Sequence, residues 1–154
     1  MYGISSRTFA GITNAGYGVD LESANPRTYY FFADLYPSAL GGTLEDKPGN
    51  GRYEADRGEL VATYALSSPF SIIRFCGTLS SGIQNCSDSS SNALASLAIV
   101  FLRPNTEAII TGVHASGIGV SYVSARITVG TSSGETRCID VNQTGQVAVS
   151  VSCS

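Results

Sequence analysis

Hydrophobic residues along this chain fall into short runs separated by Gly, Pro, Asn and Ser. The clearest run covers residues 97–102 and stops at Arg103-Pro104, and the apolar pair Ile109-Ile110 follows soon after it. Such runs, rich in β-branched residues and bounded by turn residues, are typical of strands. The pattern therefore predicts strands over residues 94–102 and 108–114.

The same pattern recurs on both sides of this region. It predicts further strands over residues 16–21, 28–35, 59–66, 70–75, 120–129, 136–141 and 147–152. Eight or nine short strands with few helices are typical of a mainly β domain built as a β-sandwich of two antiparallel sheets. The predicted strands from residue 94 onward form one β region over residues 94–153.

Three stretches do not follow the strand pattern. Residues 36–58 form a long acidic, glycine-rich loop, and a loop of that length is usually functional or disordered. Residues 77–93 are predicted to be a polar loop, which contains the serine-rich segment 87–91, typical of solvated linker. Residues 1–13 carry two glycines that disfavour an independent helix, so this segment is a loop or the remnant of a longer helix.

Composition narrows the class of protein. The chain has 154 residues, which suits a single domain over 1–154, and only 14% of them are charged. Nine basic against twelve acidic residues give no electrostatic reason to expect nucleic acid or an anionic membrane as a partner. Neither a signal peptide nor a membrane span can be recognised, so we expect a fragment that carries an added Met1.

The four cysteines lie in two local groups, Cys76 with Cys86 and Cys138 with Cys153. Their spacing fits neither a zinc site nor a redox motif, so two disulfides are the favoured interpretation and reduced thiols are the alternative. We expect the pairs 76–86 and 138–153, because each closes a short loop. With a tight turn at Thr144-Gly145, position 138 would face 151, so the second pair needs a wider loop or a bulge. Paired cysteines imply an oxidising compartment.

Catalytic chemistry finds little support in the residues. His114 is the only imidazole, and no cluster of acids surrounds it in sequence, so a packing or surface role is favoured. Phosphate-binding glycine motifs are absent as well. The sequence therefore predicts a protein that is not an enzyme.

The acidic loop partly matches a calcium-binding loop. Such loops place oxygen ligands at positions 1, 3, 5, 7 and 9, glycine at 6 and an acid at 12. With Asp46 as position 1, the register also includes Asn50, the carbonyl of Arg52, and Glu54. Pro48 removes the third ligand and Arg57 replaces the twelfth, so Asp56 or Glu59 would have to close a Ca²⁺ site. The alternative is an Asn-Gly turn in a solvated acidic loop.

A family resemblance joins several of these features. The apolar run to Phe101, then Arg103, Pro104 and Ala108, with the later strands and the glycine hairpin at Gly145, resembles the C-terminal domain of the GspH/FimT family. Its members are minor pseudopilins of type II secretion and minor pilins of type IV pili. The segments 16–19, 32–34, 49–54 and 58–61 resemble prepilin-type proteins in which a calcium-loop-like insertion precedes a strand.

The resemblance implies an α+β full-length protein whose pilin-like head follows an apolar N-terminal helix. That helix would anchor the subunit in the inner membrane, and other pilin or pseudopilin subunits would be its partners in the cell envelope or an extracellular pilus. DNA binding is the first alternative, but Gly145-Gln146-Val147-Ala148 lacks the arginines that DNA-binding relatives carry in this hairpin. A tip adhesin, using residues 29–32 or the loop 36–54 for a glycan, is the second alternative.

Overall fold

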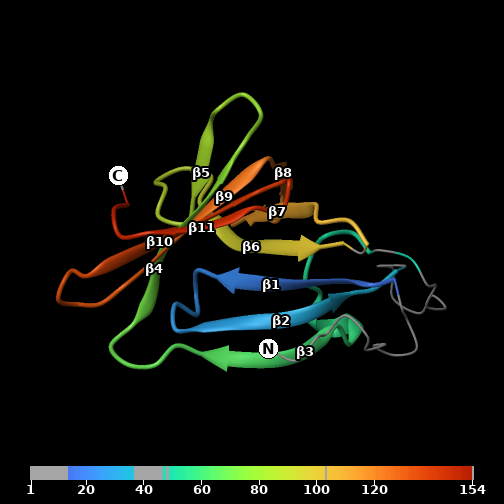
Figure 1. Cartoon of the computed structure of the whole chain (residues 1–154), viewed down its shortest axis with the longest axis horizontal. Coiled ribbons are helices and arrows are strands. Elements are labelled where there is room, and N and C mark those ends of the chain that lie inside the picture. Colours follow the sequence, from blue (N-terminus) through green and yellow to red (C-terminus); the bar gives the residue numbers. More distant parts are fainter. Residues whose placement is uncertain (1–13, 37–46, 48, 103, 154) are drawn as a thin grey trace.

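The computed structural model describes residues 14–36, 47, 49–102 and 104–153. In these residues the chain forms two antiparallel sheets and almost no helix (Figure 1). The six-stranded sheet has the order β3-β2-β1-β6-β7-β8, and the five-stranded sheet has the order β11-β10-β9-β4-β5. No helix in the described ranges is long and apolar enough to cross a membrane.

The strands of the six-stranded sheet are β1 (Gly16–Glu22), β2 (Thr28–Asp34), β3 (Leu60–Ala65), β6 (Leu94–Phe101), β7 (Ala108–His114) and β8 (Gly119–Tyr122). Those of the five-stranded sheet are β4 (Ser71–Thr78), β5 (Gln84–Cys86), β9 (Ser124–Gly130), β10 (Thr136–Asn142) and β11 (Val147–Ser150).

The two sheets share one hydrophobic core. Leu97, Ile99 and Ile110 from the six-stranded sheet belong to the same buried cluster as Phe75 and Ile127 from the five-stranded sheet. Side chains alternate between the faces of a strand, so one face of each sheet supplies this core. We call these two faces the inner faces.

Two predictions about strands are wrong. Residues 120–129 are not one strand: β8 and β9 lie in different sheets, and the N–H of Val123 between them donates to the carbonyl of Thr78. The polar segment 77–93 is not all loop, since β5 pairs with β4 through Cys76 and Cys86. The remaining predicted strands are confirmed, with bounds that differ by at most three residues.

The outer face of the six-stranded sheet is covered by residues 49–59. This segment contains a short 3-10 helix, Ala55–Arg57, and the ring of Tyr53 stacks on Tyr30 and packs against Phe32 at centroid distances of 5.5 and 5.3 Å. The predicted remnant 1–13 and most of the first half of the loop 36–58 lie outside the described residues.

Candidate functional site

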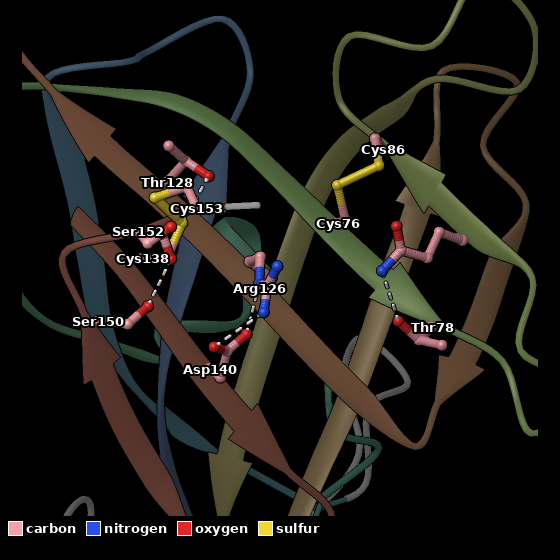
Figure 2. A network of polar contacts seen from close by, with 11 residues as sticks. Cys76, Thr78, Cys86, Arg126, Thr128, Cys138, Asp140, Ser150, Ser152 and Cys153 are labelled. Carbon is pink, nitrogen blue, oxygen red and sulfur yellow. Dashed lines mark hydrogen bonds and ion pairs between the residues drawn. A yellow bond between two sulfur atoms is a disulfide. The ribbon is translucent and has the colours of Figure 1, made fainter. Parts of the chain in front are cut away.

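Both predicted disulfides are present (Figure 2). Cys76 and Cys86 lie directly opposite each other on β4 and β5, with their Cα atoms 4.0 Å apart. Cys138 joins Cys153 with Cα atoms 5.4 Å apart. Disulfides persist in oxidising environments, so the folded domain belongs to an extracytoplasmic compartment.

The second disulfide has the wider loop that its geometry requires. Cys138 pairs in register with Ser150, not with residue 151, because the β10–β11 turn closes with a bond from the N–H of Asn142 to the carbonyl of Gln146. After Ser150 the chain bends, and the Ser150 hydroxyl donates to the carbonyl of Ser152. Cys153 thereby comes back to Cys138.

The outer face of the five-stranded sheet is polar. Arg126 on β9 forms a two-pronged ion pair with Asp140 on β10, with nitrogen–oxygen distances of 2.7 and 3.2 Å (Figure 2). This Arg126 contact with Asp140 raises the pKa of the guanidinium. Cys76 and Cys138 share this face with the ion pair, because Cys76 is the register partner of Arg126 and Cys138 lies two residues from Asp140. This face is therefore held by covalent and ionic contacts rather than by apolar packing.

The residues that carry the family resemblance come together at one end of the molecule. Ala108, at the start of β7, donates its N–H to the carbonyl of Gln143 in the β10–β11 turn at 3.0 Å. Gly145 in that turn has a positive φ of 81°, and a Cβ there would lie 1.6 Å from the carbonyl oxygen of Thr106. Only glycine allows so close an approach. Phe101 ends β6 beside this contact and Pro104 is exposed in the turn after it, while Arg103 lies outside the described residues.

An apolar groove of about 380 Å³ lies between the inner faces of the two sheets. Twelve side chains line it, and among them only Tyr29 carries a polar atom. They are Val19, Leu21, Tyr29, Leu66, Ile72, Ile99, Phe101, Ile127, Val129, Ile139, Val141 and Val147. We call this feature the apolar groove.

The groove continues onto an uncovered strip of sheet. Phe75, Ile127, Ile139 and Val149 occupy one row across β4, β9, β10 and β11. Phe75 and Ile127 are buried in the core, whereas Val149 at the end of the row is 68% exposed and its neighbour Val147 is 55% exposed. The inner face of the five-stranded sheet thus extends past the part that the other sheet covers. We call Val147 and Val149 the edge valines.

A second site of interest is the cluster of acids under residues 49–59. Asp34 and Glu59 are both completely buried. One Asp34 oxygen accepts the N–H of Gly51 at 2.8 Å, and the Glu59 carboxylate accepts the N–H groups of Leu35 and Glu54 at 3.0 and 2.8 Å. These bonds fix the loop to the end of β2.

Burial raises the pKa of both acids. Desolvation is the largest cause, and it brings the pKa of Asp34 to about 6 and that of Glu59 to about 7 against the opposing backbone hydrogen bonds. Repulsion from Glu54 adds to both shifts, and repulsion from Asp34 adds to that of Glu59. The cluster therefore holds more negative charge than its surroundings favour.

The structure distributes the predicted calcium ligands unevenly. Asn50, Glu54 and Glu59 belong to the hydrogen-bonded cluster and Arg52 lies beside it, whereas Asp56 is exposed on the 3-10 helix. Asp46 lies outside the described residues. Among residues 14–36, 47, 49–102 and 104–153, no three His, Cys, Asp or Glu side chains form a group that could hold a metal ion.

Sequence reasoning missed Asp34 and Asp20. Asp34 is the last residue of the aromatic strand β2. The sequence feature that could have identified it is an acid at a strand end, followed by a loop that contains Asn-Gly. Asp20 lies inside β1 beneath residues 52–54 and is only 4% exposed. His114 is nearly buried, with its ring Nδ1 2.6 Å from the carbonyl oxygen of Asn92, which agrees with a packing role.

Comparisons with known proteins found no match. No family model matches the chain, and no curated protein or solved structure matches it.

Proposed function

We propose that this chain is a non-enzymatic structural subunit, a minor pilin or pseudopilin, of a type IV pilus or a type II secretion pseudopilus. In this proposal the domain is a pilin-like β-sandwich head, and it is displayed in the cell envelope or on an extracellular filament. The observation that carries the proposal is the apolar groove with its edge valines. The Arg103-Pro104 and Gly145 resemblance supplies the family.

The groove suits a role in assembly because it leaves core-type side chains without a cover. Apolar patches that continue out of a core commonly mark sites of contact with other proteins. A filament subunit needs such a surface, since each copy must bury part of itself against its neighbours. The disulfides agree with a head domain that folds outside the cytoplasm.

Two binding functions are weaker alternatives. A DNA-uptake pilin needs cationic side chains that neutralise phosphates. The β10–β11 turn offers neutral side chains instead, and the side-chain oxygen of Asn142 accepts the N–H groups of Thr144 and Gln146 there. A glycan-binding adhesin would need accessible rings. Tyr30 and Phe32 are engaged with Tyr53, and Tyr29 stacks on Tyr64 at 5.3 Å.

The proposal is tested by assembly in cells that express the full-length gene. Val149→Asp places a charge on the edge valines, and we expect the variant to fold but to fall at least about tenfold in the filament fraction, because an unpaired charge is costly to bury at a contact. Ile83→Asp is the matched control, since Ile83 is 60% exposed in the β4–β5 connection, away from the groove. Equal incorporation of the two variants would contradict the proposal.

A further inference from the structure

Two carboxylate oxygens in the acid cluster have no hydrogen-bond partner. Asp34 is completely buried, and while its Oδ2 accepts the Gly51 N–H, its Oδ1 has no hydrogen-bond partner. The Oε2 of Glu54 is also buried and without a partner. A buried carboxylate oxygen without a donor is costly, so each such atom in a folded protein calls for an explanation.

The backbone around these oxygens follows the order of a calcium loop. With Asn50 taken as position 5, Gly51 falls at 6, Arg52 at 7 and Glu54 at 9, and Asp34 at the end of β2 takes the place of the first ligand although it lies further back in the sequence. Gly51 has the positive φ, 77°, that the sharp turn at position 6 needs. Tyr53 at position 8 is apolar in its contacts, since it packs on Phe32.

The closing acid is Glu59. It lies two residues later than position 12, and the 3-10 helix Ala55–Arg57 takes up the difference. Its two oxygens accept the N–H of Leu35, next to Asp34, and the N–H of Glu54. The carboxylate is therefore held against both ends of the loop, as a closing ligand requires.

We propose that this loop is a calcium site in which Asp34, and not Asp46, is the first ligand, with Asn50, the carbonyl of Arg52 and Glu59 completing the protein set. Glu54 contributes through water, as position 9 often does. The set uses two carboxylates with an amide and a carbonyl oxygen, so it does not require the three acidic, His or Cys side chains that the described residues do not bring together. Oxygen donors of this kind, with water for the remaining positions, suit Ca²⁺.

The site does not depend on the proposed function, and it is tested on the purified, disulfide-bonded protein. Ca²⁺ at about 100 times its Kd is expected to raise the Tm by about 5–10 °C, with EGTA reversing the rise and the same concentration of Mg²⁺ giving a smaller one. The chain has eight tyrosines and no tryptophan. Tyr53 next to the site is therefore expected to sensitise Tb³⁺ luminescence that Ca²⁺ competes away.

Substitutions distinguish a calcium site that begins at Asp34 from one that begins at Asp46. Asp34→Asn and Glu59→Gln are each expected to weaken Ca²⁺ binding at least about tenfold, while Asp46→Asn and Asp56→Asn stay within about twofold of the wild type. Should Asp34→Asn fail to fold by circular dichroism, Glu59→Gln and the wild-type titration decide. An unchanged Tm with no saturable Tb³⁺ signal would overturn the proposal, as would loss of binding in Asp46→Asn alone.

Discussion

Asp20 is a carboxylic acid in the middle of β1, and its environment makes the stability of the domain depend on pH. Burial, with a smaller contribution from Glu22, raises its pKa to about 8. Between about pH 4 and pH 8 the folded protein keeps a proton on Asp20 that the unfolded chain releases. The contribution of Asp20 to the free energy of unfolding is therefore most favourable below about pH 4 and falls as the pH rises to about 8.

The substitution Asp20→Asn removes this dependence. We expect it to raise the free energy of unfolding at pH 8 by at least about 1 kcal/mol and to change it little at pH 4. Urea unfolding at both pH values measures the effect, and Asp56→Asn, on the exposed 3-10 helix, is the control. Equal stability changes at the two pH values would show that Asp20 ionises normally.

Gly145 provides a second test at the level of single residues. Gly145→Ala combines a positive φ with a Cβ that would overlap the Thr106 carbonyl, so we expect a loss of at least about 3 kcal/mol. Gly134→Ala has the positive φ alone, with nothing within 4 Å of the added Cβ, and should cost about 1–2 kcal/mol. Similar losses in the two variants would remove the steric role of Gly145.

Residues whose chemistry is local were predictable, and those whose role depends on tertiary contacts were not. The cysteine pairs followed from spacing because each closes a short loop. Asp34 could not be assigned, since its partner Gly51 lies 17 positions away across a long insertion. The sequence register therefore began at Asp46, the nearest acid before Asn50.

At the level of elements, the disulfide after β11 is expected to stabilise the fold. The Cys138–Cys153 bond closes a separation of 15 residues and ties the last residues beyond β11 back to β10. The double variant Cys138→Ser/Cys153→Ser is expected to lose about 3 kcal/mol of unfolding free energy. Denaturant unfolding measures it, and a wild type insensitive to complete reduction of both disulfides would contradict a stabilising role.

The alternation of apolar and polar residues predicted the strands correctly where a continuous apolar segment stays within one sheet. It failed at Val123, where Tyr122 and Ala125 are both buried although they are three residues apart. That break in the alternation of two marks the place where the chain leaves one sheet for the other. β5 was missed because two polar residues and a cysteine are too short to show an alternating apolar pattern, and only the pairing with β4 defines this strand.

The whole molecule combines a polar outer face on the five-stranded sheet with an inner face that is only partly covered. Arg126, Asp140 and the disulfides occupy the first, and the apolar groove with its edge valines opens on the second. A sequence cannot show how far two sheets overlap, so the groove was not predictable from periodicity. The offset of the sheets is what gives the proposed subunit a surface for neighbours.

Site-specific photo-crosslinking at Val149 in cells that make the full-length protein tests the central claim most directly. A photoreactive residue there should form a covalent adduct with another prepilin-type subunit, identified by mass spectrometry, while the same residue at Ile118 should give none. Ile118 is equally suited to the comparison because it is 63% exposed in the β7–β8 connection. Adducts at Val149 that contain no filament subunit, or none at all, would contradict the assignment as a pilin or pseudopilin.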